Sequence, residues 1–199
     1  YGVRNLHKTV ENAIKLKLKY LTVFGFSTEN WNRSKPEIKF LFKLFESYLD
    51  EALASLNTDN VKIRFIGNFE NFDQKIQIKM KKLTDKTIKN SKITLTLAVN
   101  YGGRYDVIQA TKRMFSDKNY LNLNEKNFSS YLLNYEIPSP DLLIRTGGEL
   151  RLSNFLLWDL AYTELLFLPV MWPDFDLNLL NYSVSEYKKR KRNFGGNDF

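Results

Sequence analysis

Residues Lys92–Val99 have the sequence KITLTLAV, in which apolar and β-branched residues follow one another with almost no interruption. A short apolar run of this kind predicts a strand that is buried on both faces of a sheet. Two earlier runs have the same character, Tyr20–Phe26 (YLTVFGF) and Val61–Ile66 (VKIRFI). Segments with helical spacing separate the three runs, and this alternation predicts a mostly parallel sheet with helices on both faces.

The rest of the sequence continues the alternation of helices and strands. Helical patterns are expected at about 3–18, 36–56, 69–90, 104–116, 125–134, 153–161 and 177–191, and further strands at 141–145 and 164–168. The chain has no internal repeat and no linker rich in Pro, Gly or Ser. We therefore expect one α/β domain over residues 1–199.

The composition restricts the possible functions. Hydrophobic residues make up 43% of the 199 residues and charged residues 26%, which is typical of a globular protein. The absence of Cys and the single His exclude thiol catalysis, disulfide bonds and a Cys/His zinc site. The net charge of +8 indicates an anionic partner, which could be nucleic acid, anionic lipid or a phosphorylated small molecule.

Two further features of the sequence predict the cellular compartment of the protein. The first residues show no secretory signal, which predicts a cytoplasmic protein. The most apolar segment, 155–172, contains Asp159 and Glu164 and is therefore expected in the protein core rather than in a membrane.

Ligands of a parallel α/β sheet bind beyond the carboxyl ends of its strands, so the segments after the predicted strands are the candidate sites. Three of these segments are rich in Gly, Arg, Asn and Ser. They are Phe26–Ser34 (FSTENWNRS), Asn100–Asp106 (NYGGRYD) and Arg145–Ser153 (RTGGELRLS).

The segment RTGGELRLS has the residues of a diphosphate cradle. Arg145 ends a predicted strand, and Arg151 and Ser153 lie at the start of the helix predicted at 153–161. Guanidinium groups pair with phosphate oxygens through two hydrogen bonds, and a helix N-terminus offers free N–H groups. Alternatively, Gly147-Gly148 is an ordinary turn, the arginines are surface residues, one of them tethered by Glu149, and Ser153 only caps the helix.

The segment FSTENWNRS gathers polar side chains around a tryptophan, which is typical of a binding loop. The candidate residues are Ser27, Thr28, Glu29, Asn30, Trp31 and Arg33. Alternatively, Ser34 caps the next helix, Glu37 completes the capping box and Trp31 packs on the core. For NYGGRYD we expect a tight turn with Asp106 in the first helical turn, or a weaker phosphate-binding turn.

Three more features point to a partner. The helix expected at 36–56 has two apolar stripes, which predicts a second contact: a subunit interface, a channel for an apolar ligand, or burial between the sheet and a neighbouring helix. Burying the Glu164 carboxylate without a partner would cost folding free energy, so Mg²⁺ or an arginine should pair with it. The basic run Tyr187–Gly196 fits an anionic partner or a solvated helix end.

Several motifs together resemble the cis-prenyltransferases, most of all the bacterial undecaprenyl diphosphate synthases. These are FSTENWNRS, NYGGRYDVIQA, PDLLIRTGGELRLSNFLLWDLAYTELLF, WPDF and the closing RxRxFGG, in this order. The resemblance implies an α/β domain with an apolar tunnel and Mg²⁺-dependent condensation of isopentenyl diphosphate onto an allylic diphosphate such as farnesyl diphosphate. The product would be a long polyprenyl diphosphate, a lipid carrier precursor for the cell wall. The resemblance also implies a homodimer that makes peripheral contact with the membrane and binds no nucleic acid.

The resemblance assigns roles by position. It implies that isopentenyl diphosphate is held by Arg145, Arg151, Leu152 and Ser153, and that Glu164 helps to bind Mg²⁺. Residues Ser27–Trp31 and Arg33 match the substrate loop, with Asn30 as the catalytic residue. Because a neutral amide is not a useful base, Asn30 is expected to orient a water or the released diphosphate that takes the proton. Gly195 and Gly196 match a motif that reaches the partner's active site.

The sequence also departs from the family pattern. The opening D-G-N-G-R-W segment and the following G-H-x-x-G are missing, with Gly2 in the place of the last glycine, and we expect the chain as it stands to be nearly inactive. Leu150 replaces a frequent His and Asn193 an Arg. Three alternatives remain: a non-catalytic subunit, a basic nucleic-acid-binding module, or a nucleotide-binding enzyme, which would lack a full GxGxxG or P-loop motif.

Overall fold

The computed structural model describes residues 2–55, 60–118, 121 and 123–192. Contacts along the backbone divide the chain into two compact units, one made of residues 1–16 and 139–199 and the other of residues 17–138. The fold is of the α/β class, with parallel strands flanked by helices, as predicted. Each unit is described by itself, and the assignment of residues 1–199 to one domain stays a prediction.

A parallel sheet of three strands forms the centre of the unit 17–138. Its strands are β1 (Tyr20–Ser27), β2 (Val61–Ile66) and β3 (Ile93–Tyr101), in the order β1-β3-β2. β3 is buried along nearly its whole length, because it has a neighbour on each side and apolar residues on both faces. This confirms the prediction of a strand at KITLTLAV and shows that it is the central one of the three.

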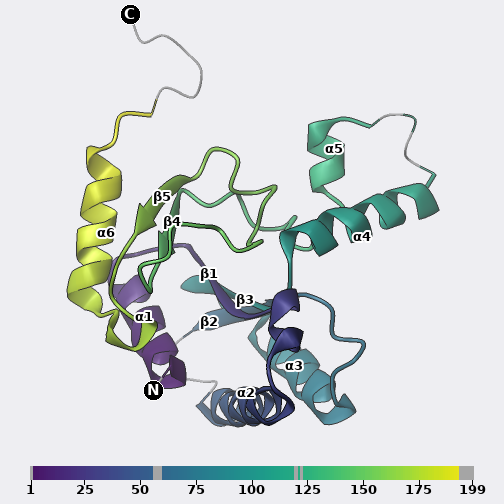
Figure 1. Cartoon of the computed structure of the whole chain (residues 1–199), viewed down its shortest axis with the longest axis horizontal. Coiled ribbons are helices and arrows are strands. Elements are labelled where there is room, and N and C mark those ends of the chain that lie inside the picture. Colours follow the sequence, from purple (N-terminus) through teal and green to yellow (C-terminus); the bar gives the residue numbers. More distant parts are fainter. Residues whose placement is uncertain (1, 56–59, 119–120, 122, 193–199) are drawn as a thin grey trace, which may run out of the picture. The chain divides into compact units, whose positions relative to one another are not determined.

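Helices α2 (Lys35–Ser55) and α3 (Gln74–Thr87) pack together beside this sheet (Figure 1). The rings of Phe45 on α2 and Phe65 on β2 meet edge to face, with their centroids 6.2 Å apart. Lys79 of α3 lies 2.8 Å from each of two α2 carboxylates, those of Glu46 and Asp50. α3 begins later than the helix expected from 69, because Asp73 caps it by accepting a hydrogen bond from the Lys75 N–H.

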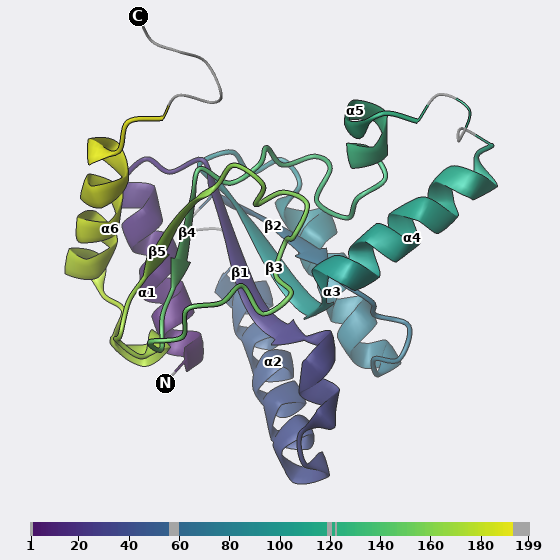
Figure 2. The same ribbon diagram turned by 45° about the horizontal axis from the view of Figure 1, so that its top comes forward.

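The unit ends with α4 (Gly103–Ser116) and the short helix α5 (Glu125–Ser129), which lie close together in Figure 2. A small apolar cluster joins them, formed by Ala110, Met114, Phe128 and Leu132. The helix expected over 125–134 stops at Ser129, and turns follow it.

The other unit contains a ladder of two parallel strands, β4 (Leu142–Arg145) and β5 (Glu164–Phe167). Its helices are α1 (Gly2–Lys15) and α6 (Leu177–Lys189), which contact each other, and α1 also contacts the 3₁₀ helix η3 (Trp172–Asp174). The indole N–H of Trp172 donates to the Gly2 carbonyl at 3.0 Å, and the Asn5 amide donates to the Phe175 carbonyl at 3.1 Å. These bonds fasten α1 to η3 and to Phe175 just after it.

The prediction of a helix at 153–161 is wrong. Ser153, Asn154 and Leu156 have φ angles of 49°, 63° and 40°, which are left-handed conformations that a right-handed helix cannot contain. The segment forms successive turns instead. The helix expected at 36–56 begins at Lys35 and is described as far as Ser55; Leu56 lies outside the described residues. Within the described part, no helix is long and apolar enough to cross a membrane.

Gly67, directly after β2, is expected to tolerate no side chain. Its φ is +141°, and an added Cβ would lie 1.9 Å from the Val99 carbonyl oxygen. Replacing Gly67 with Ala should therefore lower the free energy of unfolding by about 3 kcal/mol or more, measured by urea denaturation. Gly25→Ala is the matched control, because its Cβ would make ordinary contact, 3.6 Å from the Ala98 carbonyl oxygen. Equal stability of the two variants would contradict this account.

Candidate functional site

The loop after β1 begins with a 3₁₀ helix, η1 (Thr28–Asn32). The side-chain oxygen of Asn30 accepts a hydrogen bond from the Ser27 N–H at 3.0 Å and so fixes the start of this turn. Thr28 is half-buried, and Glu29 is exposed. The side-chain oxygen of Asn30 is therefore engaged within the loop. Its side-chain NH₂ group has no hydrogen-bond partner among the described residues and stays available to a ligand.

Trp31 belongs both to the core and to the exposed loop, as each alternative predicted. Its ring centroid lies 5.4 Å from those of Phe26 and Phe42, yet 40% of the residue is exposed. Its indole N–H donates to the side-chain oxygen of Asn100 at 2.8 Å. Trp31 is thus held in place on the core edge with a free face.

Half of the predicted capping box is present: the Glu37 side chain binds the Ser34 N–H, whereas the Ser34 hydroxyl donates to Glu37 and accepts no helix N–H from the described residues. The Glu37 carboxylate accepts hydrogen bonds from the Ser34 N–H at 3.3 Å and from its hydroxyl at 2.8 Å. These two bonds lower the pKa of the Glu37 carboxyl. Arg33 is exposed and lies 3.9 Å from Glu37, a weak surface contact that leaves its guanidinium free to bind an anion.

Asn100, near the end of β3, belongs to the candidate segment NYGGRYD, but its linking role was not predicted. It is 5% exposed and has a φ of 50°, a left-handed conformation that Asn tolerates better than most residues. Besides accepting from Trp31, its side-chain amide donates to the Asn68 carbonyl at 2.6 Å, and its own carbonyl accepts from the Asn68 N–H at 3.0 Å. Asn100 thereby joins the segments that follow β1 and β2 to the end of β3.

The rest of NYGGRYD forms the predicted tight turn into α4, with Asp106 in the first turn of the helix. Asp106 is 1% exposed and accepts hydrogen bonds from the Tyr101 hydroxyl at 2.9 Å and from the Leu133 N–H at 3.0 Å. Burial raises the pKa of its carboxyl, and these bonds oppose that shift. The group stabilises the turn rather than facing a ligand.

In the other unit, Arg145 ends β4 at its carboxyl end and is half-buried. Its guanidinium makes no hydrogen bond and no ion pair with any residue that the structure describes. Partial burial of Arg145 brings its cation no opposite charge from the described residues. An anionic ligand would supply that charge.

The glycines after Arg145 make a turn rather than a set of free donors. Gly147 and Gly148 have φ angles of 89° and 73°, which favour glycine. Their N–H groups donate to the Val170 carbonyl at 2.7 Å and to the Leu168 carbonyl at 3.0 Å. The alternative interpretation of this pair as an ordinary turn is therefore confirmed. The space beside Gly147 is open, since a Cβ added there would meet nothing within 4 Å.

The second arginine of this loop is paired. Arg151 forms an ion pair with Glu149, with both side chains well exposed, so the expectation that Glu149 tethers an arginine is confirmed. Leu152 is half-buried, and Ser153 is exposed. Because no helix follows, the prediction that Ser153 lies at a helix N-terminus is wrong, and its positive φ is the reason.

Glu164 has an arginine as its partner. Its carboxylate lies 2.6 Å from the Arg190 guanidinium, which also donates to the Leu165 carbonyl at 3.1 Å. Glu164 begins β5 opposite Leu142, whereas Arg145 lies opposite Phe167, so the ladder holds Glu164 and Arg145 at opposite ends. A role of Glu164 in metal binding stays a prediction.

Much of the basic terminal run has local partners. Lys189 lies 2.6 Å from Glu186, Arg190 pairs with Glu164, and Arg192 stacks over the Tyr187 ring at 4.3 Å. Asn193, Gly195 and Gly196 lie outside the described residues.

One of the two apolar stripes of α2 is only partly covered within the described structure. Leu49 and Ala52 are buried, and Phe42 packs against Phe72 with a centroid distance of 4.9 Å. On the second stripe, Phe40 is 61% exposed and Leu44 38%. This half of α2 thus offers an apolar surface for a further contact.

Asn100→Ala is expected to release Trp31. The substitution removes the acceptor of the indole N–H and places Ala at a left-handed φ, so the protein should lose about 1 to 3 kcal/mol of stability. The indole N–H signal of Trp31 in a ¹H–¹⁵N NMR spectrum, assigned with Trp31→Phe, should move and exchange faster with water. Asn100→Asp keeps the acceptor and is the control. An unchanged signal in Asn100→Ala would contradict the linking role of Asn100.

Comparison with known proteins identifies the family. Residues 1–195 match the family model described as "Putative undecaprenyl diphosphate synthase". The chain is 42% identical to the isoprenyl transferase of Fusobacterium nucleatum, with 98% of this chain and 84% of the relative covered. It is 41% identical to the ditrans,polycis-undecaprenyl-diphosphate synthase ((2E,6E)-farnesyl-diphosphate specific) of Wigglesworthia glossinidia brevipalpis, with 98% and 76% covered.

A solved structure agrees with the sequence matches. The crystal structure of lavandulyl diphosphate synthase from Lavandula x intermedia in complex with dimethylallyl diphosphate is similar with a TM-score of 0.92 and 33% identity, covering 98% of this chain and 86% of that one. The resemblance to cis-prenyltransferases is thereby confirmed. The chain belongs to the undecaprenyl diphosphate synthase family, a family of prenyltransferase enzymes.

Proposed function

We propose that this protein condenses isopentenyl diphosphate with an allylic diphosphate, such as farnesyl diphosphate, and so lengthens a cis-polyprenyl diphosphate. The observation that carries this proposal is Arg145, a half-buried residue whose guanidinium has no partner among the described residues. It ends a parallel strand, where α/β proteins bind their ligands. Both proposed substrates carry a diphosphate that fits this cation.

The loop after β4 is proposed to hold isopentenyl diphosphate. Arg145 would pair with phosphate oxygens, and the exposed Arg151 would exchange Glu149 for the diphosphate, which has the greater negative charge. The exposed hydroxyl of Ser153 can donate a further hydrogen bond, and Leu152 lies between the two polar residues in the sequence.

The loop after β1 is proposed to hold the allylic substrate and the released diphosphate. In the reaction, the allylic C–O bond breaks and diphosphate leaves with the electron pair. The allylic carbon bonds to C4 of isopentenyl diphosphate, and a proton is lost from C2 as the new double bond forms. Cationic groups such as Arg33 lower the energy of the developing charge. Asn30 can hold a diphosphate oxygen through its free amide, and that oxygen takes the proton.

The proposal includes Mg²⁺, which would neutralise diphosphate charge when bound. The described residues do not form a resident cation site: no group of three His, Cys, Asp or Glu gathers in this part of the chain, and Glu164 is held by Arg190. Any contribution of Glu164 to the cation would require this ion pair to open. We therefore expect the substrates to bring most of the ligands, as is usual for Mg²⁺.

The growing hydrocarbon chain needs an apolar path. Phe40 and Leu44 lie on the second apolar stripe of α2 and are exposed, and they support a channel along this helix. A homodimer in contact with the membrane completes the proposal, and light scattering of the purified protein tests the dimer.

The proposed reaction is tested by incubating the chain with farnesyl diphosphate, labelled isopentenyl diphosphate and Mg²⁺ in detergent, and by resolving the products by length. The chain is assayed alone and with the family's D-G-N-G-R-W segment added ahead of Tyr1. We expect long polyprenyl products from the extended form, little product from the chain alone, and loss of the products when the cation is chelated.

In the active form, Arg145→Ala should raise KM for isopentenyl diphosphate about 10- to 100-fold, the range expected for loss of a charged hydrogen bond. Arg145→Lys should be intermediate, because it keeps the charge and loses the two-pronged geometry. Arg4→Ala, an exposed arginine on α1, is the matched control. If neither form elongates the substrate although both are folded by circular dichroism, the proposed function is wrong.

A further inference from the structure

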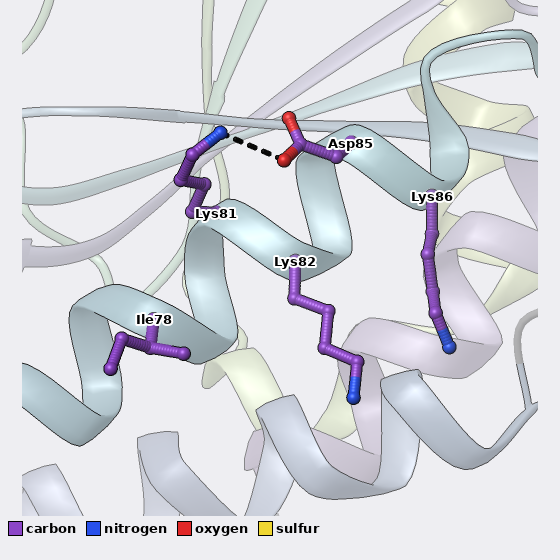
Figure 3. Close-up of a pocket in the computed structure, with 5 residues that line it drawn as sticks. All are labelled: Ile78, Lys81, Lys82, Asp85 and Lys86. Atoms are coloured by element: carbon purple, nitrogen blue, oxygen red, sulfur yellow. Dashed lines mark hydrogen bonds and ion pairs between the residues drawn. The ribbon is translucent and has the colours of Figure 1, made fainter.

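The outer side of α3 carries charge that the site does not use. Its inner side packs through the buried Ile76, Met80 and Leu83. On the outer side, Ile78, Lys81, Lys82, Asp85 and Lys86 line an open hollow of about 400 Å³ (Figure 3).

The lysines of α3 fall into two groups. Lys79 binds two carboxylates of α2, and Lys81 pairs with Asp85 at 2.8 Å. Four other lysines are exposed and have no ion pair or side-chain hydrogen bond with any part of the chain that the structure describes: Lys75, Lys82, Lys86 and, just beyond the helix, Lys89. Figure 3 shows Lys82 and Lys86 pointing the same way, away from the paired Lys81 and Asp85.

These four lysines share one face with an exposed apolar residue. Their spacing of seven, four and three residues places them along one side of a helix. Ile78 lies one turn after Lys75 and one turn before Lys82, and it is 58% exposed. We call Lys75, Ile78, Lys82, Lys86 and Lys89 the basic face of α3.

We propose that the basic face of α3 is the surface with which this protein binds anionic phospholipid membranes. Four clustered lysines on an amphipathic helix suit a negatively charged lipid surface, and an exposed isoleucine among them suits the boundary between headgroups and acyl chains. The choice of lipid rests on the proposed function, since a long polyprenyl product must enter a membrane.

The rival basic surface is less available. Three of the five consecutive basic residues Lys188–Arg192 are engaged by Glu186, Glu164 and Tyr187. Only Lys188 and Lys191 of that run are exposed without a partner within the described chain. They therefore provide a matched pair of lysines for comparison with Lys82 and Lys86.

The test is sedimentation of the protein with vesicles of phosphatidylcholine alone or mixed with phosphatidylglycerol. Wild type should bind the mixed vesicles, and binding should weaken as salt is added. The double variant Lys82→Glu/Lys86→Glu should bind at least tenfold more weakly, since each cation near such a surface contributes about fivefold. The control, Lys188→Glu/Lys191→Glu, should change binding less than about twofold.

A third variant, Ile78→Ser, keeps every charge and should weaken vesicle binding severalfold. Circular dichroism and thermal unfolding confirm that each variant is folded. Wild-type binding by the Lys82/Lys86 variant, or loss of binding in the control alone, would overturn the proposal. So would tight, lysine-dependent binding of duplex DNA together with no effect of Ile78→Ser, which would make this face a nucleic-acid site.

This experiment is independent of the synthase assay. Vesicle binding is measured without substrate, so it can succeed even if no condensation is found. Conversely, the Lys82→Glu/Lys86→Glu variant should keep wild-type condensation in detergent, where no membrane is needed. Failure of the membrane surface and failure of the proposed function therefore give different results.

Discussion

Parallel pairing of strands is the constraint on which both units of this protein depend. In a parallel ladder, the carboxyl ends of neighbouring strands meet at one edge, and the chain must leave that edge through loops. β1 and β2 therefore deliver their following segments to the end of β3, and β4 delivers Arg145 to the end of its ladder with β5. The residues with candidate chemistry lie in these loops because the pairing puts the loops there.

The hydrogen bonds made by polar groups at these strand ends determine the local structure. Asn100 uses its backbone and its side chain to bind Asn68 and Trp31, and it adopts a left-handed conformation to do so. In the β4 loop, the glycine N–H groups are used up by the segment after β5. Among the described residues, the guanidinium of Arg145 receives no such partner, and this difference is why the end of β4, rather than its glycine turn, is the proposed binding position. The positive charge of the described residues is thus divided between cations paired within the fold and cations without a protein partner.

The strands and most helices could be predicted from the sequence, because their signals are local. KITLTLAV is apolar on both faces, and Ser34 with Glu37 marks a helix start within four residues. The helix expected at 153–161 failed because its apolar spacing suits a helix while Ser153, Asn154 and Leu156 take left-handed conformations. The Arg190 partner of Glu164 and the links of Asn100 join residues far apart in the sequence, so spacing could not reveal them.

The most direct test of the account is a crystal structure of the protein with isopentenyl diphosphate bound. The account predicts diphosphate density against the Arg145 guanidinium, with Arg151 turned from Glu149 toward the phosphates and the Gly147–Gly148 turn unchanged. Two results at saturating ligand would contradict the claim that the end of β4 is the diphosphate site. One is a bound ligand that makes no contact with Arg145, and the other is a ligand bound elsewhere while the Arg151–Glu149 ion pair stays closed.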